Sequence, residues 1–383
     1  MARALYIHWP FCLSKCPYCD FNSHVRDRVD TALWQDALLA DMRREAEVAG
    51  GEALTSIFFG GGTPSLMPPA LVERLLEEAE RLWGFDPAIE ITLEGNPTSI
   101  EAANYAALAA AGVNRASLGL QALDDAALRF LGRQHMVNES LSALAVAQNH
   151  FARVSFDLIY ARPGQTPADW RAELDRALGF GTGHLSLYQL TVEPGTRFAT
   201  MVRQGDFTPL DDDAAADLFD LTRDMTAAAG LPAYEVSNHA LPGEESRHNL
   251  AYWRYHDYCG IGPGAHGRRG GLATTRHRKP ENWLAAIDTQ GDGIAEARPL
   301  GAAEQASEAQ LMGLRLREGI DTAAMSRRFA LPAAALLDAA AVERYKRQGL
   351  LWTSGSRIGV TEAGIGLLDG LLGELVPAAL LAA

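Results

Sequence analysis

Three of the chain's four cysteines lie close together near its amino terminus, in the pattern C-x3-C-x2-C. They are Cys12, Cys16 and Cys19, and they directly follow an apolar run from Ala4 to Trp9 that predicts a strand. A strand that opens into a short loop of thiols can hold a metal or a cluster against a rigid edge. This feature constrains the fold and the function more than any other part of the sequence.

Three kinds of site would use these thiols. A disulfide would leave one of the three cysteines unpaired, and their spacing suits bridging geometry poorly. Structural zinc normally takes four ligands, and His8 or His24 could complete such a set. An iron–sulfur cluster is held by thiolates, normally four for a four-iron cluster. Because Cys259 lies far along the chain, three local thiolates would leave one iron open to another ligand, as catalytic metal sites do.

The composition is that of an ordinary globular protein, with 48% hydrophobic and 21% charged residues among 383. This length suits one large and one smaller domain, and we predict a core over 1–295 and a second domain over 296–383. We find no apolar run of about 18 residues and no cleavable leader, so we expect a cytoplasmic protein without a membrane span. The net charge of −14 argues against broad nucleic-acid binding.

Apolar strand patterns alternate with helical patterns through the first half of the chain. Such alternation predicts βα units and a parallel sheet. In parallel barrels the functional groups gather at the carboxyl ends of the strands, where Cys12, Gly61, Glu94 and Gln121 are predicted to lie. The predicted strands cover 4–9, 56–59, 88–93, 115–120, 154–159 and 184–190.

A glycine run, Gly60-Gly61-Gly62-Thr63-Pro64-Ser65, follows the second predicted strand. Glycines let a backbone approach a ligand closely, with amides that point at a carboxylate or similar anion. A plain turn is the alternative. Glu94, Arg133 and Asp157 also have ordinary interpretations, as a surface carboxylate, a solvated charge and a locally bonded residue.

The cysteine pattern with Tyr18 before its last member resembles the radical S-adenosylmethionine (SAM) motif C-x3-C-x-aromatic-C. The resemblance implies a partial (β/α)6 barrel and a [4Fe–4S] cluster, bound by Cys12, Cys16 and Cys19, whose fourth iron binds SAM. The G-G-G-T-P word is similar to the family's "GGE" element, which contacts the amino group of SAM. Four short motifs follow along the chain in the same order as in the HemN-like branch: Leu-Glu-Gly-Asn-Pro, Gly-Leu-Gln, Gly-Arg-Gln and Asp-Leu-Ile-Tyr. In that branch the residues around SAM match Tyr6, Tyr18, Gly61, Gly62, Thr63, Glu94, Gln121, Arg133 and Asp157.

A further motif is similar to the H-N-x-x-Y-W signature of the HemW family of heme chaperones. It consists of His248-Asn249-Leu250-Ala251-Tyr252-Trp253. The resemblance implies that His248 holds heme, and neutral imidazole is a common axial ligand of heme iron. A lone histidine is more often structural. The basic stretch from Arg268 to Lys279 could receive the heme propionates, and a solvated loop is the alternative.

The last part of the chain changes character. Alanine-rich helices are predicted over 304–316 and 332–348, followed by a hairpin over 350–352 and 357–360 and a short helix capped by Thr361. This order resembles the winged-helix-like, mainly helical module at the carboxyl end of the HemN-like family. With few arginines in an acidic chain, contact with a protein or a ligand is a better prediction for this module than DNA binding.

Two departures separate the chain from the coproporphyrinogen oxidases of this family. Those enzymes show a further cysteine where Phe21 stands, and a long segment before the first strand. We therefore expect a chaperone that carries the cluster and SAM and passes heme to acceptor proteins, among them membrane-associated respiratory enzymes. The alternatives are a radical SAM enzyme acting on a tetrapyrrole, with coproporphyrinogen oxidation expected to be absent, and a zinc-stabilised regulator. A smaller departure, Ala161-Arg162 in place of the family's usual Gly-Leu, has no explanation in the sequence.

Overall fold

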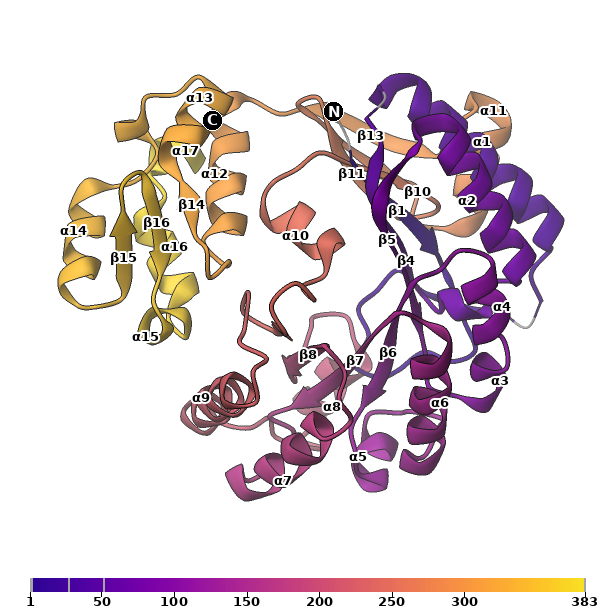
Figure 1. The fold of residues 1–383 in the computed structure, drawn as a ribbon, viewed down its shortest axis with the longest axis horizontal. Coiled ribbons are helices and arrows are strands. Elements are labelled where there is room, and N and C mark those ends of the chain that lie inside the picture. Colours follow the sequence, from indigo (N-terminus) through magenta and orange to yellow (C-terminus); the bar gives the residue numbers. More distant parts are fainter. Residues whose placement is uncertain (1–2, 27, 51, 382–383) are drawn as a thin grey trace.

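The computed structural model describes residues 3–26, 28–50 and 52–381, and its largest element within these ranges is a curved sheet of eleven strands (Figure 1). The strand order is β13-β12-β11-β10-β1-β4-β5-β6-β7-β8-β9. The strands of this sheet are β1 (Ala4–Trp9), β4 (Leu54–Gly61), β5 (Phe85–Gly95), β6 (Arg115–Gln121), β7 (Arg153–Tyr160), β8 (His184–Gln189), β9 (Asn238–Ala240), β10 (Tyr258–Ile261), β11 (His266–Arg269), β12 (Leu272–Arg276) and β13 (Ile294–Pro299).

The six strands β1 and β4 to β8 run parallel to one another, which confirms the predicted βα units of a partial barrel. The connecting helices lie on the convex side of the sheet (Figure 1). Helix starts follow local chemistry: Asp30 caps α1 by accepting from Leu33 N–H, and Thr166 and Asp169 form a capping box at α7. The helices of this half are α1 (Thr31–Ala49), α2 (Pro69–Trp83), α3 (Ser99–Ala102), α4 (Tyr105–Ala110), α5 (Asp125–Phe130), α6 (Val137–His150), α7 (Pro167–Leu178), α8 (Arg197–Gln204) and α9 (Asp212–Ala228), with a short turn η1 (Pro64–Leu66).

The sheet extends beyond the predicted barrel on its other edge. Strand β10 runs parallel to β1, and the antiparallel strands β11, β12 and β13 continue outward from it. These strands are short and rich in glycine, threonine and arginine, so they lack the apolar run that identified the others. A separate pair, β2 (Phe11–Cys12) and β3 (His24–Val25), closes the cysteine loop at its base.

The basic stretch that was expected to contact propionates is largely interior, so that expectation is wrong for its first three arginines. The Nε of Arg276 lies 2.7 Å from Asp41 of α1, and its side chain is fully buried. Arg269 pairs with Glu45 of the same helix, and the guanidinium of Arg268 lies 3.5 Å from the centroid of the Tyr255 ring. A buried charge is stable only when it is paired in this way. Of the cations in the stretch, Arg278 and Lys279 are the exposed ones.

The chain then forms a smaller lobe after β13, drawn in orange to yellow in Figure 1. Strands β15 and β16 pair around Ser354-Gly355, and Thr361 caps the helix that follows, as predicted. Its core is a hydrophobic cluster distinct from that of the sheet, and the predicted boundary between 295 and 296 falls inside β13. The elements are α12 (Ala302–Gly313), β14 (Ile320–Asp321), α13 (Thr322–Phe329), η2 (Ala333–Ala335), α14 (Ala339–Arg347), β15 (Leu351–Ser354), β16 (Arg357–Val360), α15 (Glu362–Ile365), α16 (Leu368–Leu375) and α17 (Ala378–Leu381).

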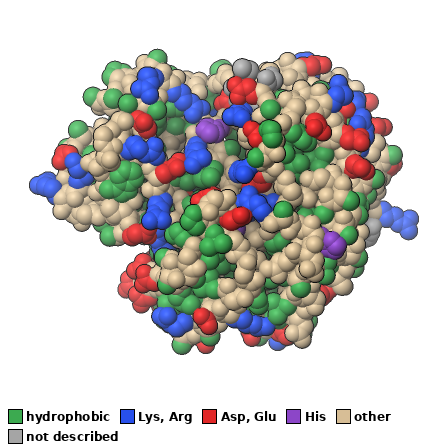
Figure 2. Space-filling model, viewed as in Figure 1, with side chains coloured by type: hydrophobic (Ala, Val, Ile, Leu, Met, Phe, Trp, Pro, Cys, Tyr) green, Lys and Arg blue, Asp and Glu red, His purple; other side chains and the backbone are tan. Residues whose placement is uncertain are grey.

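Two further helices lie between β9 and β13 in the chain. Helix α11 (Pro280–Gln290) packs against α1, and α10 (Arg247–Trp253), which carries the H-N-x-x-Y-W word, lies on the concave side of the sheet between β4 and α12 (Figure 1). Basic and acidic side chains are interspersed over the face seen in Figure 2. Within the described ranges, no helix is long and apolar enough to cross a membrane.

Candidate functional site

A cavity of about 720 Å³ opens at the carboxyl ends of the parallel strands, and the cysteine loop forms one side of it. The cavity brings together most of the residues that sequence patterns predicted for one site. Its lining includes Cys12, Cys16, Tyr18, Cys19, Gly61, Gly62, Thr63, Glu94, Gln121, Arg133 and Asp157. Two of the predicted residues, Tyr6 and His248, do not line it.

The three thiols of the loop are free, and each lies close to a polar side chain. Thr63 Oγ1 lies 3.4 Å from Cys12 Sγ, and Arg133 Nη1 lies 3.4 Å from Cys16 Sγ. The hydroxyl of Ser23 lies 4.0 Å from Cys19 Sγ. Burial raises the pKa of Cys12 and of Cys19 above the ordinary value of a thiol.

This donor set discriminates among the three predicted kinds of site. The cysteines form no disulfide. In the part of the chain that the structure describes, no three His, Cys, Asp or Glu side chains converge as ligands of one metal ion, which disfavours a single zinc. A four-iron cluster takes each thiolate at a different iron, so it needs three thiols around one space rather than at one point. The three half-buried thiols that face the cavity fit that requirement.

The glycine run is explained by close packing against the start of the cysteine loop. A Cβ atom at Gly62 would lie 2.7 Å from the carbonyl oxygen of Phe11, and Gly61 adopts a φ of +112°. The predicted direction of the amides is wrong. Gly61 N–H donates to Glu94, Gly62 N–H to the carbonyl of Trp9, and Thr63 N–H to that of Phe11. These amides therefore bind the protein itself, not an anion in the cavity.

Two half-buried carboxyl groups, those of Glu94 and Asp157, lie on the cavity wall. Burial is the main cause that raises the pKa of Glu94 to about 8, and the nearby charge of Asp157 adds to it. Burial likewise raises the pKa of Asp157 to about 6. A hydrogen bond with Ser186 lowers this pKa, but its effect is smaller than that of burial. Neighbouring carboxyls with raised pKa values inside a cleft are typical of a binding or catalytic site.

Gln121 and Arg133 complete the predicted set, and Asn96 is the residue that the prediction missed. Arg133 donates to the carbonyl of Gly119 at 2.9 Å and to the Asn96 side chain. Asn96 donates to Thr63 Oγ1 at 3.2 Å, so it joins the glycine loop to Arg133. It belongs to the same Leu-Glu-Gly-Asn-Pro word as Glu94, which was the available signal. Gln121 has a left-handed φ of 68°, and its Oε1 is buried without a hydrogen-bond partner among the described residues.

Tyr6 supports the cavity from beneath. Its hydroxyl lies 3.1 Å from Nδ1 of His8, whose Nε2 lies 2.9 Å from the carbonyl oxygen of Asn22 at the end of the cysteine loop. The Tyr6 ring also packs under Gly60, where a Cβ atom would lie 2.8 Å from it. The structure therefore places Tyr6 behind the loops that form the cavity.

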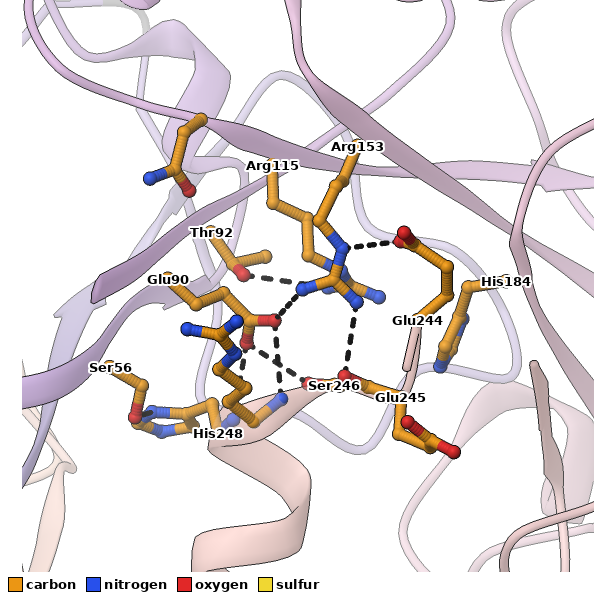
Figure 3. A network of polar contacts seen from close by, with 12 residues as sticks. Ser56, Glu90, Thr92, Arg115, Arg153, His184, Glu244, Glu245, Ser246 and His248 are labelled. Atoms are coloured by element: carbon orange, nitrogen blue, oxygen red, sulfur yellow. Dashed lines mark hydrogen bonds and ion pairs between the residues drawn. The ribbon is translucent and has the colours of Figure 1, made fainter. Parts of the chain in front are cut away.

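His248 belongs to a separate buried network on the concave side of the sheet (Figure 3). Its Nδ1 lies 3.0 Å from Ser56 Oγ and its Nε2 lies 2.8 Å from the Tyr252 hydroxyl. Glu90 accepts hydrogen bonds from the backbone N–H groups of Arg247 and His248. Burial lowers the pKa of His248 to about 3, so the ring is neutral at pH 7.

The network and the cavity lie at different levels of the same strands. Ser56 pairs in register with Glu90, whereas the cavity wall holds Glu94, four residues further along β5. At about 3.3 Å per residue this separation is about 13 Å. A heme-ligand role for His248 stays a prediction, and it would require one ring nitrogen to give up its present hydrogen bond, because that nitrogen would bind the iron.

Known proteins resemble this chain along its whole length. The sequence model described as Radical SAM superfamily matches residues 6–177, and that of the HemN C-terminal domain matches residues 300–367. A mouse protein named radical S-adenosyl methionine domain-containing protein 1, mitochondrial, is 39% identical, over 98% of this chain and 87% of that protein. The heme chaperone HemW of Mycobacterium tuberculosis is 34% identical over 97% of this chain and 94% of its own length. The HemW of Escherichia coli is 38% identical over 77% and 80%, respectively.

The fold has its own counterpart among solved structures. Escherichia coli HemN, described as a coproporphyrinogen III oxidase and radical SAM enzyme, superposes with a TM-score of 0.82 over 97% of this chain and 89% of that one. Its sequence identity is 22%, so this likeness establishes the fold alone. The two sequence models and the HemW relatives, by contrast, show that the chain belongs to the HemW family of the radical SAM superfamily.

Proposed function

We propose that this protein is a heme chaperone that carries a [4Fe–4S] cluster and SAM in its cavity and delivers heme to acceptor proteins. The observation that carries the proposal is the arrangement of three free thiols around a cavity whose wall includes Glu94, Gln121 and Asp157. Cys12, Cys16 and Cys19 would hold the cluster, which when bound supplies one-electron chemistry beside SAM.

The protein's own groups would hold and orient SAM. An ammonium group donates hydrogen bonds, so it would need acceptors, and backbone carbonyl oxygens of the glycine loop would be such acceptors. The unpartnered Oε1 of Gln121 offers a further acceptor inside the cavity. Arg133, held by Asn96 and Gly119, places a positive charge beside Cys16.

The outer part of the cavity would receive the flat apolar face of heme. Phe21, Leu190, Phe219 and Val236 are apolar residues of the cavity lining, and Phe21 is 59% exposed. A porphyrin ring buries a large apolar area, so exposed aromatic and aliphatic side chains beside a cavity suit it. A cytoplasmic location and membrane-associated acceptors remain predictions, and the mouse relative carries the word mitochondrial in its name.

Heme titration of the purified, cluster-loaded protein tests the proposal. We expect saturable binding at one site, and a Phe21→Ser variant that binds heme more weakly. An absence of heme binding by the parent protein would contradict the chaperone assignment.

The competing function is a radical SAM reaction on a tetrapyrrole, which the fold shared with HemN favours. We expect no conversion of coproporphyrinogen III, because Phe21 stands where the oxidases have a further cysteine. The test is an anaerobic assay with SAM and a reductant. Robust decarboxylation in that assay would move the protein to the enzyme class.

A further inference from the structure

The departure Ala161-Arg162 introduces a buried ion pair beside the cavity. Arg162 and Glu173 of α7 are 11% and 8% exposed, and their closest atoms, Arg162 Nη2 and Glu173 Oε2, are 2.5 Å apart. Arg162 Nη1 also donates to the carbonyl of Ile159 at 3.0 Å, and Gln165 donates to Glu173 at 3.2 Å. The hydrogen bonds from Arg162 and Gln165 together fix the orientation of the Glu173 carboxylate.

The oriented carboxylate bonds the chain just after Gln121. Glu173 Oε1 accepts from the backbone N–H of Leu123 at 2.7 Å, and Arg176 of the same helix donates to the Leu123 carbonyl at 3.4 Å. Both polar groups of this residue's main chain are thus bound to α7. Because Leu123 is two residues from Gln121, the contact limits how the turn at the end of β6 can move.

That turn needs an external restraint. Gln121 has a φ of 68°, a left-handed conformation that costs an L-residue about 1–2 kcal/mol. The register between β6 and β7 is irregular between Leu118 and Gln121, so ladder hydrogen bonds alone do not hold it. Strained residues persist at functional sites when the surrounding structure over-determines them.

We propose that Glu173, oriented by Arg162, is a positioning residue that aims the Gln121 amide into the SAM-binding part of the cavity. The inference rests on the proposed function, since SAM is the ligand that Gln121 would meet. Arg162 supplies the fixed geometry and Glu173 the contact to the turn, so the two act on SAM only through Gln121.

The experiment separates positioning from stability by two variants of cluster-loaded protein. Glu173→Gln keeps an acceptor for Leu123 N–H but loses the charge. The double variant Arg162→Leu/Glu173→Met removes the acceptor and replaces the ion pair with apolar side chains of similar size, an exchange that often preserves stability. Glu45→Gln is the control near the opposite edge of the sheet, where Glu45 pairs with both Arg269 and Arg276 in another buried cluster.

Binding of S-adenosylhomocysteine, thermal unfolding and hydrogen exchange of residues 119–124 are measured for each protein. We expect the double variant to bind about tenfold more weakly at nearly unchanged stability, with faster exchange in 119–124. Glu173→Gln and Glu45→Gln should lose stability but keep the affinity within about twofold. Parental affinity and exchange in the double variant would overturn the positioning role. Failure of the parent protein to bind the probe would instead overturn the SAM assignment, while hydrogen exchange still reports on the turn.

Discussion

His184 and His248 are held alike in different parts of the sheet, each by hydrogen bonds with one serine hydroxyl and one tyrosine hydroxyl. Nδ1 of His184 lies 2.8 Å from Ser155 Oγ, and its Nε2 lies 3.0 Å from the Tyr234 hydroxyl. His248 is held in the same way, by one serine and one tyrosine, and both histidines are labelled in Figure 3. Only His248 belongs to the H-N-x-x-Y-W word, so His184 is a natural control for its role.

Replacement of His248 by alanine should cost as much stability as replacement of His184. Each change removes two buried hydrogen bonds and should lower the free energy of unfolding by about 1–3 kcal/mol. If His248 binds heme iron, as its motif implies, the Soret maximum of bound heme should shift in the His248 variant alone, as measured by absorbance during heme titration. An unchanged Soret maximum in both variants would leave His248 with a structural role only.

The buried histidines also predict how stability depends on pH. Burial lowers the pKa of His248 to about 3, below the ordinary value of 6.5. As the pH falls below 6.5, the histidine of the unfolded chain takes up a proton, whereas the buried ring of the folded protein stays neutral. Protonation therefore stabilises the unfolded state, so the free energy of unfolding is highest above pH 6.5 and falls below it. Between about pH 6 and pH 4 this loss amounts to about 1.4 kcal/mol per pH unit for one histidine.

The measurement compares the parent protein with His248→Ala by urea unfolding at several pH values. Because the variant lacks this group, the stability difference between the two proteins should narrow by about 1.4 kcal/mol for each unit below pH 6. Glu94 and Asp157, whose pKa values are raised, act in the opposite sense in both proteins, so they cancel in the difference. A difference that stays constant from pH 7 to pH 5 would show that the folded ring takes up a proton as easily as the unfolded one.

Local patterns predicted the parts of the site that depend on neighbours in sequence. The thiols of Cys12, Cys16 and Cys19 reach one cavity because a strand delivers them, and Gly62 is glycine because a Cβ atom would strike Phe11. The parallel βα units and the C-terminal hairpin follow from periodicity and turn residues in the same way, whereas the partial barrel was implied by the family resemblance.

Pairings across long sequence distances escaped prediction. The charge of Arg276 looked available until the fold brought Asp41 to it, more than 200 residues away in the chain. The amide of Gly61 was expected to face a ligand, but Glu94 from the next strand accepts its hydrogen bond. The setting of His248 depends likewise on Ser56. A motif specifies which groups are present, whereas their partners depend on which strands become neighbours.

The cluster ligands can be tested one at a time. Replacement of Cys12, Cys16 or Cys19 by alanine removes the thiolate that one iron needs, so anaerobic reconstitution should yield little four-iron cluster. Cys259→Ala is the control, because this thiol is fully buried in β10, beside Leu5 of β1 and close to the charge of Glu45. Iron and sulfide analysis should give the parental content for the control. Loss of the cluster in the Cys259 variant would mean that the open-iron arrangement is wrong.

Ala161 is predicted to be a site of local strain that glycine would relieve. Its φ is +55°, a conformation that a Cβ atom disfavours by about 1–2 kcal/mol. Glycine also increases the entropy of the unfolded chain, which offsets about 0.5–1 kcal/mol of that gain. We therefore expect Ala161→Gly to raise the free energy of unfolding by about 0.5–1 kcal/mol.

Two matched variants make this prediction specific. Ala330, with a φ of +54° at the end of α13, should respond to glycine with a similar gain. Ala106, exposed within α4, has ordinary helical geometry, and glycine there should cost about 0.5–1 kcal/mol. Urea midpoints of the three variants distinguish relief of strain from a general effect of glycine. If Ala161→Gly weakened the protein as Ala106→Gly does, the left-handed backbone at position 161 would not be strained in solution.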